Sequence, residues 1–198
     1  MDSKKIEYTT GEKHFIQNGS DIDLKLLDFW AWAYSDYFDN TARGVLAEFI
    51  VAMALGLDVH EPRKAWAKFD LTYRSKGIEV KSASYHQKWH QEKMSNISFA
   101  IPATRAWEEE IGNLDDEKKR HAFIYVLCLL AEKDRNLVNP LDIDQWVFWV
   151  IPTQFLDDRK RSQQSITYNS LIKEVGQPIT FAKIRPKVDD LIGTSTKQ

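Results

Sequence analysis

Asp70, Glu79 and Lys81 occupy strand positions in a segment patterned as a β-hairpin, "KFDLTYRSKGIEVKSAS", residues 68–84. Because side chains alternate across a strand, Glu79 and Lys81 should share one face of the second strand. A two-residue turn would put Asp70 on that face as well, opposite Glu79 or Lys81. A three-residue turn would separate Asp70 from the other two unless a bulge restored the match. The spacing therefore permits the three charges to converge without requiring it.

Two carboxylates opposed across a hairpin repel each other, so the arrangement favours a bound cation. Mg²⁺ typically takes one or two carboxylates and several waters, and Mn²⁺ can replace it. A neighbouring lysine could then contact a water or a substrate anion, as metal-assisted phosphodiester hydrolysis requires. Glu48 is the only charged residue between Val45 and Leu57, and burying it unpaired would cost several kcal/mol. A metal site at the sheet would satisfy it.

The order of these residues resembles the PD-(D/E)XK nuclease superfamily, whose fold includes the restriction endonucleases. A helix glutamate is followed by "FD", eight residues and "EVK", and the resemblance spans roughly residues 40–131. Phe69 stands where the name of the motif has proline. The resemblance implies an α/β fold, a restriction-endonuclease-like core with a central mixed β-sheet flanked by helices. It also implies metal ligands Glu48, Asp70 and Glu79, which with Lys81 form the catalytic set.

By the same resemblance, the protein is expected to be a Mg²⁺-dependent endonuclease that hydrolyses DNA in bacterial restriction, defence or mobile-element processing. Double-strand cleavage of a palindrome would suit a symmetric homodimer. Two other functions stay open. One is a catalytically inactive DNA-binding protein with the same fold. The other is a structural or protein-interaction domain whose hairpin charges form ordinary ion pairs.

Candidate DNA-binding residues follow the expected catalytic strand directly. Amide side chains can hydrogen-bond to base edges, and lysines can neutralise phosphates. The candidates in this segment are Gln87, Lys88, Gln91 and Lys93. Arg43, at the start of the Glu48 helix, is a further phosphate-binding candidate. The alternatives are a polar loop held by a buried Trp89, and an Arg43 that serves as structural partner of an acid.

The rest of the pattern indicates one domain, residues 1–198, with N- and C-terminal additions to the 40–131 core. Ser20 and Asp23 form a capping-box signal for a first helix, and Gly56 is expected to end a second. The segment 104–120 reads as a helix or an exposed loop. Expected helices are 20–38, 39–56 with Asn40 or Thr41 as N-cap, and a short one at 169–175. Expected strands are 68–74, 77–84, 97–101, 121–131, 145–152 and, more weakly, 162–168.

Composition limits the class of protein further. The 198 residues carry a net charge of −2, so a DNA-binding face would have to be local. The single cysteine, Cys128, allows no internal disulfide. The opening residues "MDSKKIEYTTGEK" lack the apolar stretch of a signal peptide, and apolar runs are too short for a membrane span. The expected location is the cytoplasm, with no membrane partner.

Overall fold

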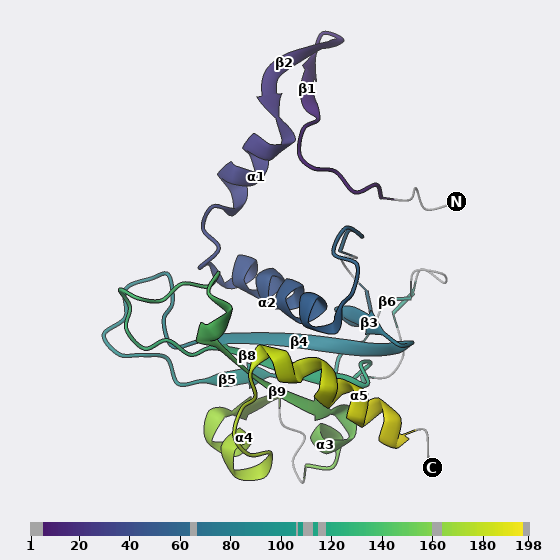
Figure 1. The fold of residues 1–198 in the computed structure, drawn as a ribbon, viewed down its shortest axis with the longest axis vertical. Helices are drawn as coiled ribbons and strands as arrows, with labels where there is room; N and C mark the ends of the chain where they lie inside the picture. Colours follow the sequence, from purple (N-terminus) through teal and green to yellow (C-terminus); the bar gives the residue numbers. More distant parts are fainter. Residues whose placement is uncertain are drawn as a thin grey trace.

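A computed structural model describes residues 6–63, 67–105, 107–108, 113–114, 118–159 and 164–195. Its centre is a four-stranded mixed sheet in the order β3-β4-β8-β9, as Figure 1 shows. Strands β4 and β8 pair in parallel, and the other two pairings are antiparallel. The mixed α/β class predicted from the sequence is therefore confirmed. The strands are β3 (Leu71–Tyr73), β4 (Lys76–Ser84), β8 (Ile124–Leu130) and β9 (Trp146–Pro152).

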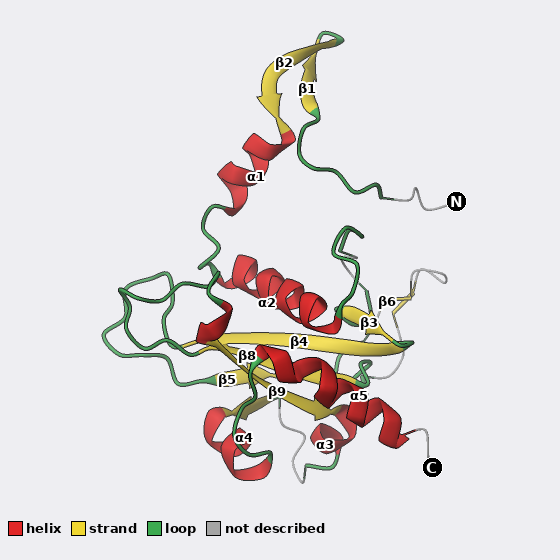
Figure 2. Cartoon of the chain, in the orientation of Figure 1, coloured by secondary structure: helices red, strands yellow, loops and turns green. Residues whose placement is uncertain are grey.

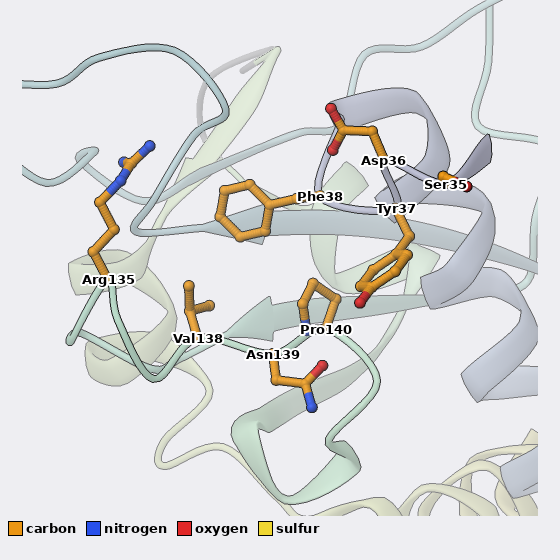
Figure 3. A pocket seen from close by; sticks show the side chains of 8 residues that line it. All are labelled: Ser35, Asp36, Tyr37, Phe38, Arg135, Val138, Asn139 and Pro140. Atoms are coloured by element: carbon orange, nitrogen blue, oxygen red, sulfur yellow. The ribbon is translucent and has the colours of Figure 1, made fainter. Parts of the chain in front are cut away.

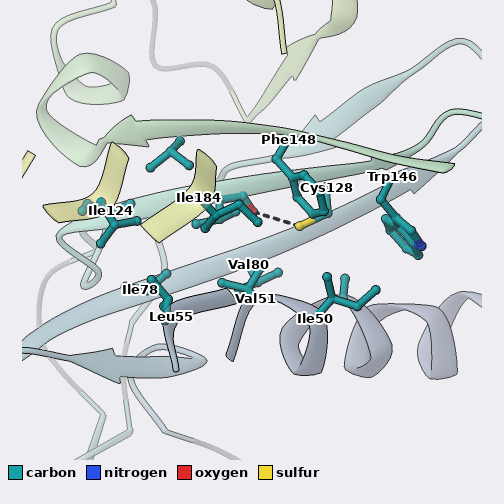
Figure 4. Close-up of a cluster of buried hydrophobic side chains, with 14 of the residues drawn as sticks. Ile50, Val51, Leu55, Ile78, Val80, Ile124, Cys128, Trp146, Phe148 and Ile184 are labelled. Atoms are coloured by element: carbon teal, nitrogen blue, oxygen red, sulfur yellow. Dashed lines mark hydrogen bonds between the residues drawn. The ribbon is translucent and has the colours of Figure 1, made fainter. Parts of the chain in front are cut away.

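Helix α2 (Asn40–Leu55) covers one face of this sheet together with the C-terminal helix α5 (Ile184–Ser195). The predicted stop is confirmed, since Gly56 ends the helix in the left-handed conformation with φ 71°. The predicted N-cap, Asn40 or Thr41, was wrong: Asp39 caps the helix, and its carboxylate accepts the Thr41 N–H at 2.9 Å. Apolar side chains from both helices meet alternate side chains of the strands (Figure 4). The labelled members of this cluster are Ile50, Val51, Leu55, Ile78, Val80, Ile124, Cys128, Trp146, Phe148 and Ile184.

The opposite face of the sheet packs against short elements that follow in the chain. Alternation sends Tyr125, Leu127 and Leu129 of β8 to this side, where they meet Phe99 and Leu171. Every residue of β8 is thus buried, as the uncharged run predicted. The strand pair β5–β10 and the helices α3 and α4 build this second layer. Helices α3 and α4 lie below the sheet in Figure 2.

These smaller elements have the following bounds: β5 (Ser98–Ala100), β6 (Trp107–Glu108), β7 (Asn113–Leu114), the 3-10 turn η1 (Ile143–Gln145), α3 (Thr153–Asp157), β10 (Ser165–Thr167), α4 (Tyr168–Glu174) and the 3-10 turn η2 (Phe181–Lys183). The helix expected near residue 169 and the strand before it are confirmed. Of the segment 104–120, strands β6 and β7 are described, while residues 106, 109–112 and 115–117 lie outside the described part. No helix within the described ranges is long and apolar enough to cross a bilayer.

The N-terminal part departs from the predicted 20–38 helix. Residues Ser20–Lys25 form strand β2, which pairs with β1 (His14–Gln17), and helix α1 spans only Leu26–Tyr34. The helix is capped by the Asp28 carboxylate, which accepts the Lys25 N–H at 2.7 Å, so the predicted Ser20–Asp23 capping box was wrong. This unit projects from the body (Figure 1), and α1 buries none of its residues; Trp32 is 85% exposed.

Candidate active site

The β3–β4 hairpin has the two-residue turn that convergence requires. Residues 74 and 75 both have positive φ, 47° and 61°, the signature of a type I′ turn. The register pairs Leu71 with Ile78, and its continuation opposes Asp70 to Glu79. Beyond the strand the ladder becomes irregular, since the Asp70 N–H bonds to the Ile78 carbonyl at 3.1 Å. The hairpin thus brings the two predicted acids to one end of β3.

Asp70 is fixed from two sides. One oxygen of its carboxylate, Oδ2, accepts the backbone N–H of Val80 at 2.7 Å. The preceding residue, Phe69, lays its ring over Gly77, so closely that a Cβ built on Gly77 would lie 2.4 Å from the Phe69 ring. The aromatic ring therefore anchors the backbone next to Asp70. An aromatic residue at position 69 has a clear packing role.

Glu79 and Lys81 lie on the same face of β4, as alternation predicts. Lys81 Nζ lies 2.5 Å from Glu79 Oε1, and their side chains are 31% and 19% exposed. Burial raises the pKa of Glu79, and the nearby Asp70 charge raises it further, while Lys81 acts in the opposite direction. A carboxylate that is desolvated beside a second carboxylate gains from any cation that reaches both. The lysine only partly meets that need.

Glu48 points into the protein from α2, and its partner is an arginine that the sequence patterns did not identify. Arg63, in the segment between α2 and β3, donates from Nη2 to Glu48 Oε1 at 2.8 Å and from Nε to Oε2. The Glu48 side chain is 12% exposed and that of Arg63 is 44% exposed. Both oxygens of this carboxylate are therefore engaged by one guanidinium. A buried lone glutamate demands a cation, but the sequence alone does not say which loop supplies it.

These residues form a row of interacting charges. The hydrogen bond to Glu48 raises the pKa of Arg63, and the negative charge of Asp70 raises it further. The negative charge of Glu48 also contributes to the raised pKa of Glu79. The row contains three carboxylates and two cations, so one negative charge is left over. Tyr125, beside Glu79 on the neighbouring strand, has its pKa raised to about 12 by burial and by the Glu79 charge. Its hydroxyl therefore stays protonated near neutrality.

Two of the three carboxylates are engaged in ion pairs, Glu48 with Arg63 and Glu79 with Lys81. In the part of the chain that the structure describes, no three His, Cys, Asp or Glu side chains are placed to hold a metal as they stand. The donor chemistry nevertheless fits Mg²⁺, because Asp70 and Glu79 supply the couple of carboxylates that this ion usually takes from a protein.

The candidate DNA-binding glutamines are engaged with their own loop. Gln91 Oε1 accepts the Gln87 N–H at 2.6 Å, and both side-chain amides donate to Ser95 Oγ, at 3.3 Å and 2.9 Å. Lys88 forms an ion pair with Asp36, which raises the pKa of Lys88. Lys93 is exposed. In this conformation Lys93 is the candidate best placed to meet a phosphate.

Arg43 has a structural environment. Its side chain is buried, with the residue only 4% exposed, and its guanidinium donates to the Phe38 carbonyl at 3.3 Å and to Asn40 Oδ1 at 2.8 Å. Burial lowers the pKa of Arg43. This arginine ties the start of α2 to the segment before it. Trp89, expected to be buried in one interpretation of its loop, is 59% exposed, so that expectation was wrong.

A pocket lies apart from the acids, where the link between α1 and α2 meets the loop after β8 (Figure 3). None of the four predicted catalytic residues is among those that line it, which are Ser35, Asp36, Tyr37, Phe38, Arg135, Val138, Asn139 and Pro140.

Comparisons with protein-family models, curated proteins and solved structures give no match. The function is therefore argued from geometry.

Proposed function

We propose that the protein is a Mg²⁺-dependent nuclease that hydrolyses phosphodiester bonds of DNA, acting in the cytoplasm. The observation that carries the proposal is the hairpin register. It ends at Leu71, opposite Ile78, so the next residues along the two strands are Asp70 and Glu79. Lys81 lies on the same face as Glu79, with its Nζ 2.5 Å from the Glu79 carboxylate. We further propose that the sheet and α2 form a restriction-endonuclease-like core, with Glu48 at the edge of the site.

In this proposal each residue has a defined task. Asp70 and Glu79 would hold Mg²⁺, and Glu48 would join them once its arginine leaves. A bound Mg²⁺ would supply Lewis-acid activation of water and neutralise the charge of the phosphodiester. Lys81, released from Glu79, would orient the attacking water and stabilise negative charge on the phosphate. The Val80 N–H would keep Asp70 aimed at the site through its 2.7 Å bond.

Cleavage assays test this proposal directly. Purified protein is incubated with plasmid DNA in Mg²⁺, in Mn²⁺ and in EDTA, and compared with the Asp70→Asn and Lys81→Ala variants. We expect cleavage only with metal, and a loss of about 100-fold or more in each variant, the scale of a missing electrostatic stabiliser. Full cleavage by Asp70→Asn would refute the site.

The inactive DNA-binding alternative is separated by the same samples. A protein that binds DNA equally well in EDTA and in Mg²⁺, but leaves it uncut, would support that alternative. Neither binding nor cleavage would favour an interaction domain. A homodimer, which would present one site to each strand of a duplex, is tested by analytical ultracentrifugation with and without DNA.

A further inference from the structure

Arg63 is a cation at the site that comes from neither strand of the hairpin. It lies in the irregular segment between α2 and β3, and it engages both oxygens of Glu48. A carboxylate with both oxygens in charge-assisted hydrogen bonds has its strongest acceptor sites occupied. Arg63 therefore competes with any cation for the Glu48 carboxylate.

The exposure of the two partners is unequal, and this decides which of them moves. The Glu48 side chain is 12% exposed and belongs to the middle of a packed helix. The Arg63 side chain is 44% exposed and is carried by a loop. Rotation about side-chain bonds can bring the guanidinium to solvent without disturbing the core. The Glu48 carboxylate, in contrast, is enclosed by its surroundings and has no comparable path to solvent.

A guanidinium that leaves a carboxylate needs another anion, and a phosphate offers the best match. The planar fork of arginine binds carboxylates and phosphates with the same bidentate geometry. Arg63 already contacts one of the three acids, so a phosphate bound beside them would be a neighbouring acceptor for its guanidinium. The substrate of the proposed reaction carries such phosphates along its whole length.

We propose that Arg63 is a positioning residue that exchanges Glu48 for a backbone phosphate of DNA, so that DNA and the divalent cation bind cooperatively. This inference rests on the proposed nuclease function and deepens it. Without DNA, Arg63 keeps Glu48 engaged and the site binds metal weakly. When DNA arrives, Arg63 moves to a phosphate and frees Glu48, and the thermodynamic linkage is reciprocal.

Four affinity measurements test the coupling between DNA and the divalent cation. They are carried out in a Lys81→Ala background so that bound DNA is not cut. Calorimetry gives the affinity for Mn²⁺ with and without a mixed-sequence DNA duplex, and fluorescence anisotropy gives the affinity for the duplex with and without Mn²⁺. With Arg63 present, we expect each ligand to tighten the other by about tenfold, the worth of one charged hydrogen-bonded contact.

Removing the arginine should change the two affinities in opposite directions. Arg63→Ala should bind Mn²⁺ about tenfold tighter in the absence of DNA, because Glu48 is already free. It should bind DNA more weakly in EDTA, with the slope of log affinity against log salt reduced by about 0.9, one phosphate contact. The coupling between the ligands should disappear. Arg105→Ala removes an exposed arginine elsewhere and should leave the coupling intact.

Two outcomes overturn the inference in distinguishable ways. If the protein with Arg63 binds Mn²⁺ and cuts DNA in the Lys81-containing form, but Arg63→Ala leaves both affinities and their coupling unchanged, only the exchange is wrong. If no variant binds Mn²⁺, the exchange and the proposed function fall together. Should Arg63→Ala not fold, Arg63→Lys replaces it. Lysine keeps the charge but not the fork, so Mn²⁺ affinity without DNA should rise by a smaller factor, and no rise refutes the exchange.

Discussion

The contact between Gly77 and Phe69 makes the placement of Asp70 testable without touching a charged residue. A Cβ added at Gly77 would lie 2.4 Å from one ring carbon of Phe69 and 2.7 Å from two others. Ordinary van der Waals contact begins at 3.4 Å, so the ring must retreat by about 1 Å. Overpacking of this size costs about 1–3 kcal/mol of folding stability. Because Phe69 directly precedes Asp70, that carboxylate should move with the ring.

We therefore expect Gly77→Ala to melt at a lower temperature and to lose cleavage by about 100-fold, the penalty for a 1 Å misplacement at a reacting centre. Gly44→Ala is a matched control, since a Cβ on this α2 glycine meets nothing within 4 Å. It should stabilise the protein by about 0.5–1 kcal/mol and keep full activity. Adding Phe69→Ala to Gly77→Ala should relieve the clash. A Gly77→Ala protein with normal stability and cleavage would refute this reasoning.

Three further predictions concern the acids and the metal. Mn²⁺ at a hundredfold excess over its dissociation constant should stabilise the protein by about 2.7 kcal/mol in thermal melts, and no shift would exclude a metal site. Glu79→Gln should melt above wild type in EDTA, by a margin that grows from about pH 4 to pH 7. The pKa of Glu79 is raised above its ordinary value of 4.5 in the folded protein. At a pH below 4.5 the protonated carboxyl therefore stabilises the fold, and this contribution is lost as the pH rises through the folded-state pKa. A margin that shrinks with pH would contradict it. Asp70→Ala should unfold about 1–3 kcal/mol more easily than Asp70→Asn in urea titrations, the cost of leaving the Val80 N–H without an acceptor. Equal stabilities of the two variants would show that this bond contributes nothing to stability.

Helix α2 and the central strands could be predicted because local and global signals agree there. Nearly every face of α2 is apolar, and Gly56 ends it in a conformation that other residues resist. The uncharged run of β8 can only be placed inside the sheet. Glu48, Asp70 and Glu79 are charged exceptions to the apolar pattern of these elements, which is why they could be chosen as candidate residues from the sequence.

The prediction missed the N-terminal hairpin because it followed a helix-capping pattern and overlooked a more specific turn pattern. Ser20 and Asp23 resemble a capping box, but Asn18 and Gly19 form the pair that favours a two-residue hairpin turn. Both residues adopt positive φ, 50° and 79°. The following segment alternates polar and apolar residues, a strand period that merges into the true helix at Leu26.

Arg63 could not be predicted, because nothing in its own neighbourhood marks it. It pairs with a residue fifteen positions earlier in the chain, across the end of a helix. The physics of Glu48 requires some cation, and a metal satisfies that requirement as well as an arginine does. Loop conformation decides between the two, and loop conformation carries no periodic signal in the sequence.

The parallel pairing of β4 with β8 also has a consequence for the order of events during synthesis. All of the chain from Tyr85 to Phe123 separates the two strands, so β4 waits for a distant partner. The β3–β4 hairpin can close early, but an isolated two-stranded hairpin is marginally stable in water. Closing a loop of this length costs chain entropy before the contacts between β4 and β8 form, so this pairing is a slow step. Glu48, Asp70, Glu79 and Lys81 therefore leave the ribosome before the sheet that positions them can form. Their arrangement is complete only after β8 has been synthesised and has paired with β4.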